Sequence, residues 1–221
     1  MRRLWHESNP ALFVRIREEL ARAFPELRVS IESGIVVIRG ALLIESEGEL
    51  LDSYEIELWM PPDFPRSIPL VREIGGRIPH TAERHMNPNG IACVIVPEEW
   101  LLTAESSNLL RFLTGPVRDY FMGQSLVERG IPWPYGDRRH GRDGLLDAYS
   151  EMTGIADHTA VPRYLEYAAA KKPKAHWKCP CGSGKSVRDC HTKELRALRA
   201  RVPRSIAVTA LSRLRNPSLG T

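Results

Sequence analysis

The sequence predicts an α+β fold, and three observations support it. Residues 8–24 carry apolar side chains at helical spacing, with Pro10 suited to the first turn and Pro25 placed to end the helix. Three runs that alternate or are rich in β-branched residues follow, at 27–31, 35–44 and 51–60. Helical patterns then resume from residue 107. A helix followed by a strand meander and further helices is typical of α+β domains.

Turn residues separate the expected strands. Gly34 marks the first turn, and Gly40 favours a β-bulge inside the second strand. The polar stretch 46–49 is expected to be a hairpin loop. The proline-rich stretch 61–69 then steers the chain off the sheet.

The second half of the chain is expected to be mainly helical. One or two helices are predicted over 107–129, with a break near Gly115-Pro116, and a rigid loop over 130–136 follows. His140 stands at the start of a further helix, and its expected role is core packing or loop fastening. The remaining helical patterns cover 157–170 and two basic stretches within 192–215 that are separated at Pro203.

A single cysteine, Cys93, lies between a tight turn and a short apolar run. In the turn 87–90, proline presets one dihedral angle and Asn-Gly supplies a positive φ. The run 91–96 is too short for a helix and is expected to be extended. A thiol just past such a turn is partly exposed and well positioned, as a covalent thioester carrier requires. The alternative is that Cys93 is a small buried hydrophobic residue.

The order of segments around Cys93 resembles the ubiquitin-conjugating enzyme (UBC) fold. A strand at 54–60 leads into the proline-rich stretch, then a histidine-bearing loop, the cysteine, Trp100 and a helix. The bacterial branch of this family carries a segment similar to R-H-x-N-P-x-G-x-x-C-x-x-V-P-E-E-W, and residues 84–100 fit it closely. The resemblance covers about residues 8 to 155 and implies a UBC-like fold with an N-terminal helix, an antiparallel meander and C-terminal helices.

The resemblance implies an acyl-transfer function for Cys93. Members of the family accept a ubiquitin-like modifier, or the C-terminus of a nucleotidyltransferase, as a thioester and pass it to an amine or thiol of a target protein. They act in bacterial conjugation and antiphage defence systems. No adenylation loop is visible in this sequence, so a separate activating enzyme is expected as a partner.

His85 occupies the position where the eukaryotic enzymes have an asparagine, eight residues before the cysteine. In those enzymes the asparagine is thought to support the oxyanion, so this departure leaves the oxyanion donor in question. His85 can donate a hydrogen bond to a developing oxyanion or act as a base for an incoming amine. The alternative is a structural histidine that fastens the loop.

The sharpest chemical signal is the set Cys179, Cys181, Cys190 and His191 around a Gly-Ser-Gly turn. Three thiols and an imidazole form a closed tetrahedral zinc set without a place for substrate. Spacing and residue types resemble the SEC-C zinc motif, C-x-C-G-S-G followed by five residues and C-C or C-H. We expect a structural zinc that folds this knuckle, and the resemblance implies a docking module for proteins or peptides. The alternative is a chance grouping of cysteines.

Charge divides the chain at residue 171. From there onward 13 Lys/Arg face 2 acids, a net charge of +11, whereas the first 170 residues carry 18 Lys/Arg against 25 acids, a net charge of −7. The basic tail can bind nucleic acid or an acidic protein, or can be a solvated helical surface. Two alternatives to the enzyme therefore stay open: an inactive UBC-like binding module, and a nucleic-acid-associated adaptor that acts through this tail.

Composition sets the domain organisation and the expected compartment. One lone and three clustered cysteines fit a reducing cytoplasm. No apolar run is long enough to span a bilayer and no apolar region follows the N-terminal arginines, so neither membrane insertion nor a signal peptide is expected. The expected parts are a UBC-like conjugating domain, a linker, a zinc knuckle and a basic helical tail, at 1–170, 171–176, 177–192 and 193–221.

Overall fold

The computed structural model describes residues 4–102, 108–136 and 141–216. The chain divides into two compact units, residues 1–137 and 138–221. The expected boundary at residue 170 lies inside the second unit, because α6 (Gly141–Thr153) and α7 (Val161–Ala169) pack against α9 (Arg204–Arg215). Apolar side chains of α6 and α7 therefore contribute to the core of the C-terminal helices.

The first unit contains a four-stranded antiparallel sheet with the strands in chain order. The strands are β1 (Leu27–Glu32), β2 (Ile35–Ser46), β3 (Glu49–Trp59) and β4 (Leu70–Glu73). The three predicted strands are confirmed. The fourth strand, β4, was not expected. It forms where the chain returns to pair with β3 directly after the proline-rich stretch. The α+β class is therefore confirmed.

The irregularity in the sheet lies at a different place from the one predicted. The pairing of β2 with β3 shifts between Ile44 and Glu45, whereas Gly40 is paired in register on both sides. Gly40 is required for another reason: its φ is +144°, and a Cβ atom there would lie 2.1 Å from the carbonyl oxygen of Glu26. The glycine therefore permits close approach of two backbone segments.

Helices begin and end close to the predicted places. The N-terminal helix α2 (Pro10–Ala23) follows the short α1 (Trp5–Ser8), and the side chain of Asn9 caps it by accepting from the Leu12 amide at 3.1 Å. The predicted break near Gly115-Pro116 is confirmed, because Gly115 has non-helical angles between α4 (Leu109–Phe112) and α5 (Arg118–Glu128). The expected start of this segment at residue 107 lies outside the described residues.

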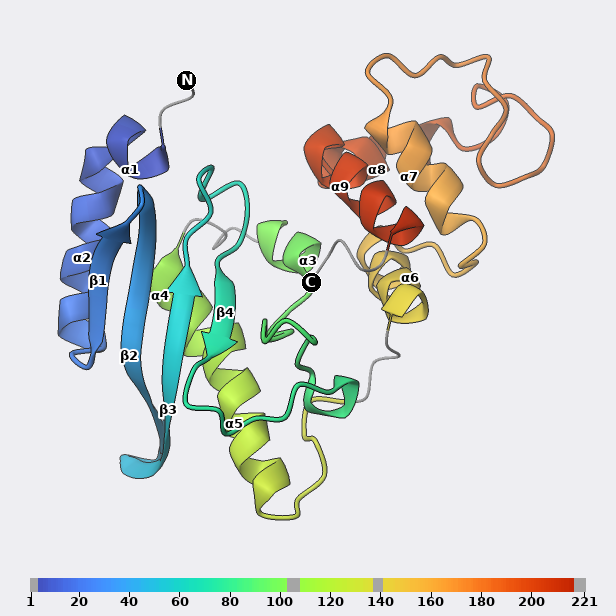
Figure 1. Ribbon diagram of the computed structural model, residues 1–221. Coiled ribbons are helices and arrows are strands. Elements are labelled where there is room, and N and C mark those ends of the chain that lie inside the picture. The colour runs from blue at the N-terminus through green and yellow to red at the C-terminus, as the bar shows by residue number, and fades with distance from the viewer. Residues whose placement is uncertain (1–3, 103–107, 137–140, 217–221) are drawn as a thin grey trace. The chain divides into compact units, whose positions relative to one another are not determined.

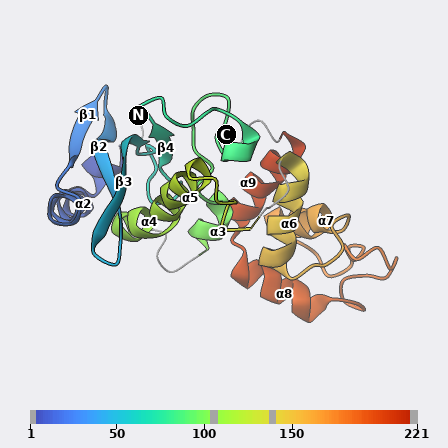
Figure 2. The same cartoon turned by 90° about the horizontal axis from the view of Figure 1, so that it is seen from below.

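Helix α5 packs along one face of the sheet and closes the core of the first unit (Figures 1 and 2). The ring of Phe121 on α5 lies 4.9 Å from that of Tyr54 on β3. Trp100, on the short helix α3 (Pro97–Leu101), is also buried and contacts Phe112 with a 5.4 Å separation of ring centroids. The residues that follow the Cys93 segment are thereby tied to the core.

The described part of the second unit contains α6, α7, α8 (Thr192–Arg201) and α9, with the cysteine-rich knuckle between α7 and α8 (Figure 1). The two basic helices separated at Pro203 are confirmed. The predicted helix at 157–170 is found as α7, and His140 lies outside the described residues. Among the described residues, every helix is too short or too polar to span a lipid bilayer.

Candidate functional site

Cys93 lies at the surface of the first unit, so the interpretation of a buried structural cysteine is wrong. Its backbone N–H donates to the carbonyl of His85 at 2.8 Å. The N–H of the preceding Ala92 donates to the carbonyl of Val71 on β4, also at 2.8 Å, and Ala92 forms an antiparallel bridge with Met86. The backbone on either side of the thiol is therefore fixed to the sheet and to the preceding loop.

The predicted turn before Cys93 is confirmed. The N–H of Gly90 donates to the carbonyl of Asn87 at 2.8 Å, and Gly90 has a φ of +80°. The side chain of Asn89 accepts from the Ile91 amide at 3.1 Å. The run that follows is less regular than expected, since Ile91 and Ala92 make isolated bridges and no strand.

Asn87 contacts the sulfur of Cys93. Its Nδ2 lies 3.2 Å from Sγ and also donates to the carbonyl of Ile91 at 2.8 Å. The amide is thus held by the turn while it points a donor at the thiol. Asn87 was not predicted from the sequence, because the family pattern points to the position eight residues before the cysteine, whereas the turn brings the residue six positions before it to the sulfur.

His85 is built into the loop by its backbone and by its ring. It adopts a left-handed conformation, with φ of 47° and ψ of 38°, and its carbonyl accepts the Cys93 amide. The imidazole packs against Trp133 with 4.5 Å between ring centroids. A left-handed non-glycine residue carries backbone strain, and such residues gather at functional sites.

Two polar side chains of helix α5 form hydrogen bonds to the loop that precedes Cys93. The hydroxyl of Tyr120 and the Nε2 of Gln124 both donate to the carbonyl of Arg84, at 3.0 and 2.6 Å, and Arg84 Nε donates back to Gln124 Oε1 at 2.6 Å. Burial raises the pKa of Tyr120, and repulsion from a Cys93 thiolate is the second cause. Tyr120 therefore lies within electrostatic range of the sulfur. The sequence predicted only a helix here, and neither Tyr120 nor Gln124 was expected to support the loop.

A second anchor of the loop is Arg77. Its guanidinium donates to Asp52 on β3 at 2.7 and 2.8 Å and to Glu128 on α5 at 2.6 and 2.9 Å, and it lies 4.4 Å above the ring centre of Tyr54. The hydrogen bonds from Arg77 hold the pKa of Asp52 well below its usual range. Sheet, loop and α5 are thereby joined on the same side of the first unit.

The four residues predicted to bind metal come together in the second unit. The ligand atoms of Cys179, Cys181, Cys190 and His191 all lie within 4.8 Å of one another. Nδ1 of His191 lies 3.3 Å from the sulfur of Cys179 and 3.2 Å from that of Cys190, and the sulfurs of Cys181 and Cys190 are 3.6 Å apart. This cluster can hold a metal ion.

The donor set fits zinc. With Zn–S bonds of about 2.3 Å, a tetrahedral site has sulfur–sulfur edges of about 3.8 Å, close to the separation found. The hydrogen bond from Ser183 lowers the pKa of Cys181 to about 6, which favours the thiolate form that binds metal. Burial raises the pKa of Cys179, and a cation at this site opposes that effect.

The knuckle is attached to its neighbours by hydrogen bonds. Arg163 on α7 donates to the carbonyl of Pro180 at 2.8 Å, and the hydroxyl of Thr192 donates to the carbonyl of Val187 at 2.7 Å. Lys178 and Ser186 form an antiparallel bridge across the loop. Backbone bonds within the loop, such as the Cys179 N–H to the Lys185 carbonyl at 2.9 Å, fold it around the four candidate ligand side chains.

Comparisons with protein-family models, with curated proteins and with solved structures found no match to this chain. The site therefore rests on the geometry of the chain itself.

Proposed function

We propose that this protein is a ubiquitin-conjugating-like acyl carrier in which Cys93 holds a protein C-terminus as a thioester. The observation that carries this proposal is the exposed thiol of Cys93 with an amide donor 3.2 Å from its sulfur. The sulfur sits on a backbone that is hydrogen-bonded to both the sheet and the loop. The segment order and the fit of residues 84–100 to the bacterial ubiquitin-conjugating-like motif support the same class.

The proposed acyl transfer depends more on the position of the Cys93 thiol than on its chemical activation. The thiolate of Cys93 attacks the activated carbonyl carbon of the incoming C-terminus, and the leaving group departs from the tetrahedral intermediate. An amine or thiol of the target then attacks the thioester, the C–S bond breaks and Cys93 is released as thiolate. Both steps place negative charge on the carbonyl oxygen, where a fixed hydrogen-bond donor is most effective.

We assign the donor role to Asn87 and a positioning role to His85. The amide of Asn87 already contacts the sulfur and is fixed by the Ile91 carbonyl. His85 sets the path of the backbone that receives the Cys93 amide, and Trp133 holds its ring. Because no adenylation motif is present in the sequence, the activated C-terminus comes from a separate activating enzyme, and the target is a further protein.

We further propose that Cys179, Cys181, Cys190 and His191 bind one structural Zn²⁺. The ion would link the two ends of the knuckle, which contains few buried apolar side chains of its own. All four positions are taken by protein ligands, so the ion has no place for substrate. The knuckle then serves as a rigid docking element for a partner protein.

The experiment uses a fluorescein-labelled peptide that ends in Gly-Gly and carries a 2-mercaptoethanesulfonate thioester. We expect the zinc-loaded full chain to form an adduct that dithiothreitol removes and that peptide mapping places on Cys93. Cys93→Ala should form no such adduct at this position, and its zinc content should be unchanged. A wild-type protein whose Cys93 stays unlabelled would instead support a non-catalytic binding module.

A further inference from the structure

The two kinds of cationic side chain are separated along this chain. Of its 31 Lys and Arg residues, 25 are arginine and 6 are lysine, and all six lysines lie within residues 171–193. The first compact unit, residues 1–137, has 14 arginines and no lysine. The basic stretch after the lysines, residues 194–215, has six arginines and again no lysine.

Charge alone does not account for this separation. Arginine and lysine both carry one positive charge at neutral pH, and arginine serves that purpose everywhere else in this chain. The two differ in nucleophilicity: a lysine amine can lose its proton and attack an acyl group, whereas the guanidinium stays protonated. The lysines therefore mark where the chain offers side-chain amines, and the first compact unit, which carries Cys93, offers none.

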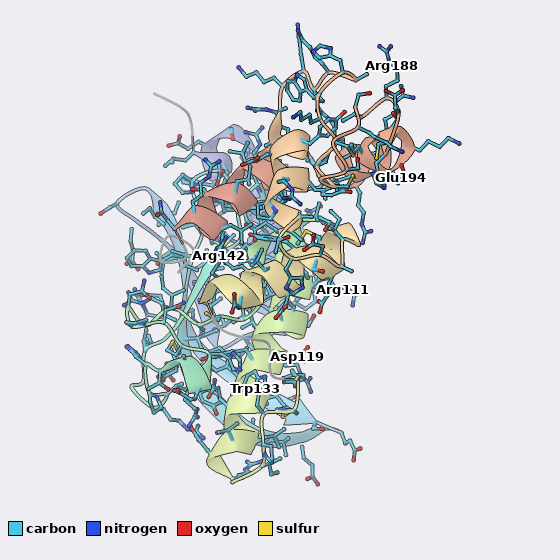
Figure 3. All side chains as sticks on the ribbon, turned by 90° about the vertical axis from the view of Figure 1, so that its right-hand side faces the viewer. Arg111, Asp119, Trp133, Arg142, Arg188 and Glu194 are labelled. Carbon is cyan, nitrogen blue, oxygen red and sulfur yellow. The ribbon has the colours of Figure 1, made fainter. Side chains whose placement is uncertain are left out.

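The lysine amines are accessible. The six residues, which we call the lysine cluster, are all exposed: Lys171, Lys172, Lys174, Lys178, Lys185 and Lys193. Arg188 is the one arginine within the same range, and Figure 3 shows it on the outer part of the knuckle, where nitrogen-tipped side chains extend away from the ribbon. Hydrogen bonds to Pro180 and Val187 hold the loop that carries two of these side chains, Lys178 and Lys185.

We propose that, besides the target protein, this protein itself accepts the acyl group carried by Cys93, and that the lysine cluster is the site of this self-modification, on the same chain or on a second copy. The inference rests on the proposed function. A neutral lysine amine attacks the carbonyl carbon of the Cys93 thioester, the C–N bond forms and the C–S bond breaks. The sulfur leaves as a thiolate, and the proton lost by the amine passes to solvent or to the thiolate. The product is an isopeptide on the lysine cluster and a regenerated Cys93.

This assignment also explains why the first compact unit contains no lysine. A thioester is exposed to every amine within reach of it, and a lysine near Cys93 would capture the acyl group before a target arrives. Arg72, which donates to the Asn89 carbonyl in the turn before Cys93 at 3.3 Å, supplies its charge beside the site without being an acceptor. Self-modification is thereby directed to the lysine cluster.

The test uses the Gly-Gly peptide thioester with the zinc-loaded full chain. We expect, besides the adduct on Cys93, a second product that dithiothreitol does not remove and that peptide mapping places on residues 171–193. Cys93→Ala should lower this stable product at least tenfold, which separates transfer through the cysteine from direct acylation. A variant with all six lysines changed to arginine keeps the charge, and it should keep the reducible adduct and lose the stable one.

Two results would overturn the inference while leaving the proposed function intact. One is a reducible adduct on Cys93 without any stable product on the lysine cluster. The other is a stable product whose yield is the same in wild type and in Cys93→Ala. If no reducible adduct forms, the proposed function itself fails and the acceptor site falls with it. Zinc content and the reducible adduct of the six-arginine variant show that its fold is preserved.

Discussion

The contact between Asn87 and the sulfur of Cys93 gives the most specific expectation, for the variant Asn87→Ala. Removal of Nδ2 takes away the donor 3.2 Å from Sγ and leaves the backbone turn bonds in place. A hydrogen bond to a charged group contributes about 1.5–3 kcal/mol, and solvent competition at the exposed thiol reduces this to about 1 kcal/mol. The thiolate fraction at neutral pH should therefore fall about fivefold.

The rates of alkylation and of aminolysis distinguish the effect of Asn87→Ala on the thiolate from its effect on the oxyanion. Alkylation of Cys93 by iodoacetamide should slow by only about two- to threefold, because a more basic thiolate is also more nucleophilic. Aminolysis of the loaded thioester should slow by about tenfold or more, because in the proposed assignment the same amide donates to the oxygen that becomes charged. Both rates can be followed by intact-protein mass spectrometry on the zinc-loaded chain.

Asn89→Ala is the matched control. It removes a side-chain bond of the same turn, to the Ile91 amide, without touching the sulfur. Its aminolysis rate should stay within about twofold of wild type. Equal slowing of aminolysis in both variants would show that turn rigidity, and not the amide donor, sets the rate, and the assignment of Asn87 would be wrong.

Four further outcomes are expected. Gly40→Ala should lower the free energy of unfolding by at least about 2 kcal/mol in urea melts, since its Cβ would meet a backbone carbonyl at 2.1 Å and φ is positive. Asp52, whose pKa is lowered in the fold, stabilises the protein above its unfolded pKa of about 3.9, so the stability difference between wild type and Asp52→Asn should be constant above pH 5 and shrink as pH falls below 4. Cys179→Ser should lose the single equivalent of zinc measured by a chromogenic chelator, while Cys93→Ser retains it. Arg72→Lys should acquire a dithiothreitol-stable adduct at residue 72.

Local sequence signals predicted most of the elements correctly. The helix at the N-terminus, three strands, the break at Gly115-Pro116 and the break at Pro203 each depend on periodicity or on proline and glycine, which act over a few residues. The four residues that could hold a metal ion were found for the same reason, since their spacing is short and their residue types are distinctive. Such features do not require knowledge of distant contacts.

The features that were missed depend on contacts between distant segments. Strand β4 has only four residues and is defined by its pairing with β3. Gly40 was interpreted as a bulge because the approach of the Glu26 carbonyl cannot be read from neighbouring residues. Gln124 lies forty positions from the Arg84 carbonyl that it fixes, and only the packing of α5 brings the two together.

Local sequence signals also could not predict where the two compact units begin and end. The apolar pattern of α7 shows that one of its faces is buried but does not show against what, and the structure packs it against α9. Asn87 was overlooked for a related reason, because the turn that brings its amide to the sulfur was predicted but the direction of the side chain was not.

The central claim is that Cys93 carries an acyl group, and the most direct measurement is the intact mass of the zinc-loaded chain after brief exposure to the Gly-Gly peptide thioester. We predict a mass increase of one peptide acyl group that dithiothreitol reverses, that maps to Cys93 and that is absent in Cys93→Ala. An unmodified Cys93 under conditions in which a small-molecule thiol reagent labels it fully would contradict the claim.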